Sequence, residues 1–163
     1  VFSQWKDPDL YSLAPGGAFE GDTGWMRTGD ATLHPENNPF GLSGPGSRSL
    51  RLRGGGQATS PPVCVSDRHP FLRFTVHALG NGKPKDLRIE ALWDDENGSN
   101  TALLATENSK KFKDWKPSNK IPLGSELPLK TGQPLHVRLK FSLGDSDGDW
   151  LVDDVYIDPR ASR

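Results

Sequence analysis

Three acidic residues near the two ends of the chain are candidates for binding a metal ion. Glu20 lies in a glycine-rich segment, and Asp153 and Asp154 interrupt an apolar run near the carboxyl end. If that run is a strand, its neighbouring side chains face opposite ways, so at least one of the two aspartates points toward the core. A buried carboxylate is costly unless it is hydrogen-bonded or bound to a cation. Calcium takes several oxygen ligands, and Glu20 with Asp153 or Asp154 would supply carboxylates if the chain ends lie together; a hydrogen-bonded structural carboxylate is the alternative.

A second set of residues could bind a ligand at the surface. Arg73, His77 and Arg138 alternate with apolar residues, and they would form part of a polar platform if their strands share one sheet. An ordinary solvated face is the alternative, and a site for an acidic sugar or a protein partner is another. Trp115 stands among charged residues and is the candidate for an exposed ring, unless it packs beneath its own loop. The platform itself holds no aromatic residue, which argues against a flat surface for glycans.

Catalysis finds little support in the sequence. The four histidines show no spacing typical of metal ligands, and the chain contains no GxSxG, HExxH or glycine-rich phosphate loop. We therefore expect a protein that is not an enzyme.

Alternating apolar and polar residues predict strands at 72–78, 87–93 and 135–141. Weaker patterns predict strands at 18–20, 25–28, 31–34, 49–53, 101–105 and 150–157. Glycines and prolines separate these stretches, and no segment has a sustained apolar period of 3.6. The pattern favours an all-β fold, an antiparallel two-sheet β-sandwich that buries one face of each strand. We expect one domain over residues 1–163, with an extended amino-terminal arm at 1–15 and a flexible tail at 160–163. Trp25 and Trp93 are expected in the core.

The charge balance limits the possible partners. The chain has 20 Lys and Arg against 21 Asp and Glu, without the basic excess of a nucleic-acid-binding domain, so polyanions are not expected as partners. No apolar run reaches the ~20 residues of a membrane span. Val1 does not open a signal peptide, and we expect any such segment to have been removed. Cys64, the only cysteine, lies between two valines and is expected to be buried; a reactive or intermolecular thiol is the alternative.

Five segments together resemble jelly-roll carbohydrate-binding modules of the galactose-binding-like superfamily. These are PGGAFEGDTGW, SRSLRL, FLRFTVHA, the tryptophan at 115 and WLVDDVYIDP, and they span nearly the whole chain. The chain also looks similar to uncharacterised secreted proteins of actinobacteria in its ATSPP-C-V segment. In that group the equivalent of Cys64 pairs with a cysteine near the amino terminus, where this chain has Phe2.

The resemblance implies a function and a cofactor. It implies a secreted, non-catalytic module that binds a glycan or cell-surface polysaccharide, with a structural calcium held by Glu20 and by Asp153 or Asp154. A structural surface protein that assembles into a homo-oligomer through its strand edges is the alternative function.

Overall fold

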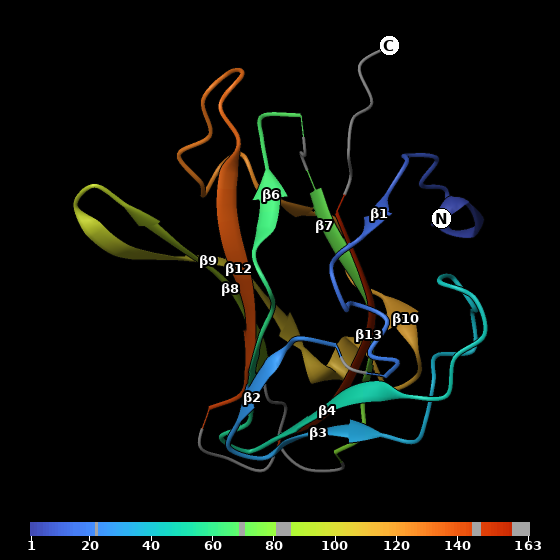
Figure 1. Cartoon of the computed structure of the whole chain (residues 1–163). Helices are drawn as coiled ribbons and strands as arrows, with labels where there is room; N and C mark the ends of the chain where they lie inside the picture. The colour runs from blue at the N-terminus through green and yellow to red at the C-terminus, as the bar shows by residue number, and fades with distance from the viewer. Residues whose placement is uncertain (22, 69–70, 81–85, 145–147, 158–163) are drawn as a thin grey trace.

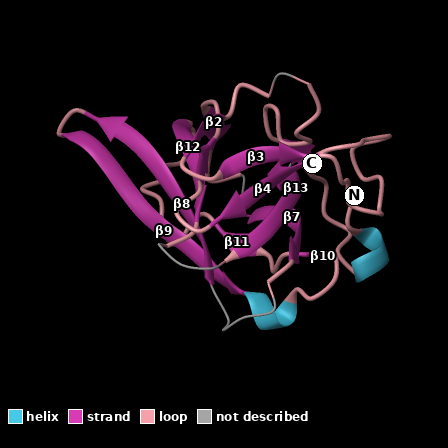
Figure 2. Cartoon of the chain, turned by 90° about the horizontal axis from the view of Figure 1, so that it is seen from below, coloured by secondary structure: helices cyan, strands magenta, loops and turns pink. Residues whose placement is uncertain are grey.

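The computed structural model describes the chain except for residues 22, 69–70, 81–85, 145–147 and 158–163. The predicted tail at 160–163 lies outside the described residues. Two antiparallel sheets form a β-sandwich (Figures 1 and 2), and the predicted fold class is confirmed. Among the described residues, no helix is both long and apolar enough to span a membrane.

The first sheet carries both ends of the described chain. Its strands run in the order β10 (Lys116–Pro117), β7 (Phe71–Ala78), β13 (Asp149–Ile157), β4 (Ser49–Arg53) and β3 (Ala31–His34). Two short strands also belong to this sheet. The strand β1 (Ser12–Leu13) pairs with β13, and β11 (Ile121–Pro122) pairs with β7. The first and last strands of the chain therefore lie together, as the metal hypothesis requires.

The second sheet is built around β12. Its order is β2 (Met26–Thr28), β5 (Gln57–Thr59), β12 (Leu135–Ser142), β8 (Asp86–Asp95) and β9 (Gly98–Asn108), and β6 (Val63–Val65) also pairs with β12. The β8–β9 hairpin extends beyond the body of the sandwich (Figures 1 and 2). Two short 3₁₀ helices, η1 (Ser3–Trp5) and η2 (Ser109–Lys111), lie outside the sheets.

Aromatic rings from both sheets meet in the core. Phe74 of the first sheet and Phe141 of the second have ring centroids 5.0 Å apart, edge to face. Trp25 also contacts Phe141, with ring centroids 5.8 Å apart, and is buried as predicted. Such pairs add packing energy beyond the area they bury, so these rings join the two sheets.

The outer face of the first sheet is covered, whereas that of the second is open. The amino-terminal arm buries Phe2 and Tyr11 against Tyr156 of β13. The loop after β3 lies over the same strand, because Asn38 hydrogen-bonds the carboxylates of Asp153 and Asp154. The second sheet therefore offers the more open face for a ligand within the described part of the chain.

Candidate ligand-binding face

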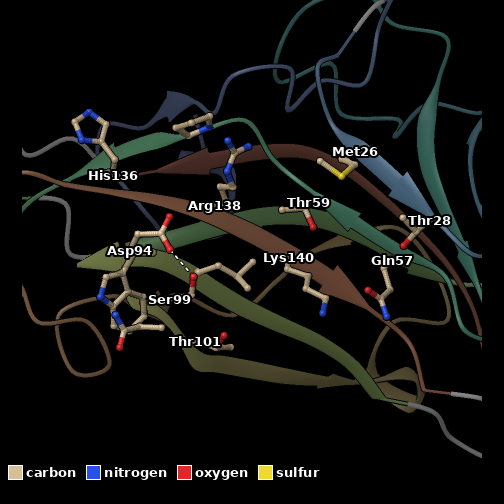
Figure 3. Close-up of a pocket in the computed structure, with 14 residues that line it drawn as sticks. Met26, Thr28, Gln57, Thr59, Asp94, Ser99, Thr101, His136, Arg138 and Lys140 are labelled. Atoms are coloured by element: carbon tan, nitrogen blue, oxygen red, sulfur yellow. Dashed lines mark hydrogen bonds between the residues drawn. The ribbon is translucent and has the colours of Figure 1, made fainter. Parts of the chain in front are cut away.

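An open pocket of about 640 Å³ lies on the outer face of the second sheet (Figure 3). We call it the outer pocket. It exists because the residues of β12 alternate: Val137, Leu139 and Phe141 are buried, so the residues between them point away from the core. The side chains that line it come from five strands and the segment after β5, and they are Met26, Thr28, Gln57, Thr59, Pro62, Leu92, Trp93, Asp94, Ser99, Asn100, Thr101, His136, Arg138 and Lys140.

Most of the lining groups can exchange hydrogen bonds with hydroxyls. Four hydroxyl side chains and two amides contribute to the walls, beside the positive side chains of Arg138 and Lys140. Asp94 is the one carboxylate, and its Oδ1 accepts a hydrogen bond of 2.7 Å from the Ser99 hydroxyl. Arg138 donates a hydrogen bond of 3.3 Å to the backbone oxygen of Ser60, which holds its guanidinium over the sheet.

Trp93 is the aromatic residue among those that line the pocket. The sequence predicts this residue in the core, and it does pack against core residues. However, Trp93 is only partly buried and lines both the outer pocket and a smaller hollow of about 380 Å³ beside Leu135. It lies near the tip of β8, where the hairpin extends past the opposing sheet and the core side of the strand is no longer fully covered.

The predicted polar platform does not exist as one surface. Arg138 lies on β12 in the second sheet, whereas Arg73 and His77 lie on β7 in the first. Arg73 is only 9% exposed, forms an ion pair with Asp7 of the amino-terminal arm, and lies 4.8 Å from the centre of the Phe2 ring. It anchors the arm and is removed from solvent.

Trp115 and His77 do lie together, on the outer side of the first sheet. Their rings are 5.7 Å apart, and the Trp115 Nε1 donates a hydrogen bond of 3.1 Å to Glu36. His77 Nε2 lies 3.0 Å from the backbone oxygen of Lys113. Trp115 is therefore half-buried and tied to the loop after β3 rather than to its own loop, and it lies on the other sheet from the outer pocket.

The aspartates of β13 are buried beneath the loop after β3. Asp153 and Asp154 are 0% and 1% exposed, and the Asn38 Nδ2 donates to one oxygen of each, at 2.8 and 2.7 Å. Burial, and then the neighbouring charge of Asp154, raises the pKa of Asp153 to about 7. The Oδ1 atom of Asp154 is buried and has no hydrogen-bond partner among the described residues. A cation fits this site, because it would satisfy that oxygen and offset both charges.

The carboxylate of Glu20 binds the end of this same loop, just before β4. It accepts hydrogen bonds of 2.7 Å from the backbone nitrogens of Ser47 and Arg48. Burial acts to raise the pKa of Glu20, but these hydrogen bonds outweigh burial and lower it. Within the described part of the chain, no three His, Cys, Asp or Glu side chains gather as metal ligands. The calcium remains a prediction, for which Asp153 and Asp154 are better placed than Glu20.

The prediction that Cys64 is buried is wrong. Its thiol is exposed, because Val63 and Val65 on either side of it face the core. Cys64 lies opposite His136 across the β6–β12 pair, and the two side chains therefore share the outer face of the second sheet.

Several solved structures that are similar to this chain are carbohydrate-binding modules. The CBM22-1 xylan-binding domain from Paenibacillus barcinonensis Xyn10C is 17% identical, with a TM-score of 0.61 over 94% of this chain and 95% of its own. The family 11 module of a Clostridium thermocellum cellulosomal cellulase is 13% identical, with a TM-score of 0.55 over 96% and 99%. This chain has the fold of a carbohydrate-binding module.

A third solved module is also similar to this chain, whereas comparisons of the sequence found no match. The module CBM28, described as specific for non-crystalline cellulose, is 14% identical, with a TM-score of 0.59 over 90% of this chain and 95% of its own. No family model and no curated protein matches the sequence. The resemblance found in the sequence is thus confirmed for the carbohydrate-binding-module fold, whereas the relation to actinobacterial proteins stays a prediction.

Proposed function

We propose that this chain is a secreted, non-catalytic module that binds a polysaccharide in the outer pocket. The observation that carries the proposal is the open outer face of the second sheet, where hydroxyl, amide and charged side chains line a pocket that has Trp93 at one end. A ring covers the apolar face of a sugar, while polar side chains bond its hydroxyls. The solved neighbours, which are described as binding xylan, non-crystalline cellulose or a mixed-linked tetrasaccharide, support a glycan as the ligand.

The pocket favours binding over hydrolysis. Most glycosidases use a pair of carboxyl groups that flank the scissile bond. Among the described residues that line the outer pocket, Asp94 is the one carboxylate, and it is engaged by Ser99. The polar groups of the pocket are therefore suited to recognition.

Affinity electrophoresis tests this function. The protein would be run in native gels that contain xylan, mixed-linkage β-glucan, hydroxyethylcellulose, glucuronoxylan or polygalacturonate, and in a gel without polysaccharide. We expect at least one polysaccharide to retard the wild type, and Trp93→Ala to lose most of that retardation because it removes the ring.

Trp115→Ala is the matched control for that experiment, since it removes a ring of the same type from the first sheet. It should leave the retardation unchanged. No retardation by any polysaccharide, together with sedimentation as a homo-oligomer, would favour the structural, self-assembling role instead.

The buried aspartates support calcium as a structural cofactor of the module. A calcium ion beside Asp153 and Asp154 would bond the unpartnered Oδ1 of Asp154 and offset the charge of the pair. The ion would also hold the loop after β3 to β13, through Asn38. It would stabilise the face of the sandwich opposite the outer pocket and take no direct part in binding glycan.

A further inference from the structure

A row of basic side chains follows the middle of the outer pocket. His136, Arg138 and Lys140 are alternate residues of β12 and point to the same face (Figure 3). At about 3.3 Å per residue, the row extends about 13 Å along the strand. It is long enough to meet more than one sugar ring of an extended chain.

Glu90 of β8 lies opposite Lys140 in the sheet, but its carboxylate pairs with another residue. The ion pair found nearby on the same face joins Arg88 to Glu90, with 3.9 Å between nitrogen and oxygen. Asp94, the acidic residue of the lining, lies on β8 and accepts its hydrogen bond from Ser99. Within the described residues, neither Arg138 nor Lys140 forms an ion pair.

The balanced composition of the chain conceals this local charge. The net charge of −1 averages the whole sequence, and the acidic residues lie mostly outside the outer pocket. The charge of the whole chain argued against a polyanion as partner. The local positive charge of the outer pocket removes that argument for this face. A neutral polysaccharide offers these two cations only hydroxyl and ether oxygens, whereas a carboxylate also carries the opposite charge and forms stronger, charge-assisted hydrogen bonds with them.

We propose that the ligand of the outer pocket is an acidic polysaccharide, one that carries uronic acid carboxylates. This inference rests on the proposed function and narrows its ligand class. Arg138 and Lys140 bind the carboxylates, and the hydroxyl side chains Thr59 and Thr101 bond the sugar hydroxyls beside them. Trp93, at the end of the pocket, contacts a sugar ring.

Matched charged and neutral polysaccharides test the inference. Binding would be measured by isothermal titration with glucuronoxylan and with the same polymer after chemical reduction of its carboxylates to alcohols. Polygalacturonate and its methyl ester form a second pair. We expect at least tenfold tighter binding to the charged member of one pair. That preference should shrink between about 0.1 M and 1 M salt, as the Debye length falls from about 10 Å to about 3 Å.

Single substitutions test which side chains cause the preference for the charged polymer. Arg138→Gln and Lys140→Gln should each weaken binding of the charged polymer about tenfold and leave binding of the neutral polymer nearly unchanged. Lys116→Gln is the control, because it removes the same charge from β10 in the first sheet. Thermal unfolding of each variant checks that it is folded.

The possible failures are distinct. Equal or tighter binding of the neutral polymers, or no loss in the two pocket variants, overturns the inference and leaves the proposed function in place. No binding of any polysaccharide overturns both. Equally tight binding of single-stranded DNA at the same salt concentration also overturns the inference, because the row would then attract any polyanion.

Discussion

Asp154 directly follows Asp153 along β13, yet both carboxylates accept a hydrogen bond from the same amide nitrogen, Nδ2 of Asn38. Adjacent residues of a regular strand would face opposite sides. Here the alternation is interrupted, because the register of β13 with β7 shifts after Asp153 and Asp154 has a φ of 49°. A non-glycine residue in this left-handed region is strained, and such strain often accompanies a binding site.

Calcium should stabilise the protein through this pair. At a calcium concentration 100 times the Kd, a site present only in the folded state adds about 2.7 kcal/mol to the free energy of unfolding. For a chain of this size that corresponds to a rise in Tm of about 5–10 °C. Thermal unfolding in calcium and in EDTA would measure this rise, and Asp154→Asn should abolish it.

Two further variants make the calcium experiment specific. Glu96→Gln removes an exposed carboxylate at the tip of the β8–β9 hairpin and should keep the full shift. Glu20→Gln tests the third predicted ligand: a retained shift would remove Glu20 from the site. The calcium proposal fails if the wild type unfolds at the same temperature in calcium and in EDTA.

Asp7→Asn should destabilise the protein strongly. Asp7 is 3% exposed and its carboxylate pairs with Arg73 and Lys120. Removing one partner of a buried ion pair costs about 3–5 kcal/mol, because the other charge stays buried. Asp9→Asn is the control: Asp9 pairs with Lys120 at an exposed position, where loss of the pair costs about 0–1 kcal/mol. Urea denaturation of both variants would measure the difference, and equal losses would contradict this view of the arm.

Acid should weaken the same contact. Burial acts to raise the pKa of Asp7, but hydrogen bonds from Tyr11, Lys120 and Arg73 outweigh burial and lower it below 3.8. The unfolded chain thus takes up the proton at a higher pH than the folded chain. The stabilisation by Asp7 is full above the ordinary pKa of about 3.9 and is lost as the pH falls through the lower, folded value. Between about pH 5 and pH 2, stability should fall less steeply in Asp7→Asn than in the wild type.

Trp115→Phe should change stability without changing ligand binding. The variant keeps a ring beside His77 but loses the hydrogen bond to Glu36, which is worth about 1 kcal/mol. Its Tm should fall by a few degrees while its retardation in polysaccharide gels equals that of the wild type. Weaker retardation of this variant would return Trp115 to the binding site.

Cys64 should react in the native state. Its thiol is exposed and shares a face with His136 of the outer pocket. A thiol reagent such as Ellman's reagent should therefore modify one equivalent without denaturant, and a bound polysaccharide should slow the reaction. Reaction only after unfolding would contradict the orientation of β6.

The sequence predicts the long strands well, because alternation over seven residues is hard to produce by chance. The predicted segments at 72–78, 87–93 and 135–141 correspond to β7, β8 and β12. The three-residue strands β5 and β6 and the two-residue strands β1, β10 and β11 were missed, because most segments this short show no clear period. Residues 18–20 form no strand, and the positive φ of 54° at Phe19 marks a turn there.

The site was harder to predict, because alternation tells which side of a strand a residue occupies but not which sheet the strand joins. Arg73, His77 and Arg138 were correctly placed off the core, yet they belong to two sheets that face opposite ways. The long-range cover over the first sheet, from the arm and the loop after β3, leaves no local pattern in the sequence. That cover leaves the second sheet as the open face. The sequence alone therefore could not show that Thr59, Thr101 and Lys140 line a pocket.

NMR chemical-shift mapping tests most directly whether the ligand binds on the second sheet. The ¹⁵N-labelled protein would be titrated with an oligosaccharide of the polysaccharide that retards it most. We predict that the largest shifts of backbone amides lie in β12 and β8, around Arg138 and Trp93, with β7 and β10 nearly unchanged. Largest shifts around His77 and Trp115, on the first sheet, would contradict the account.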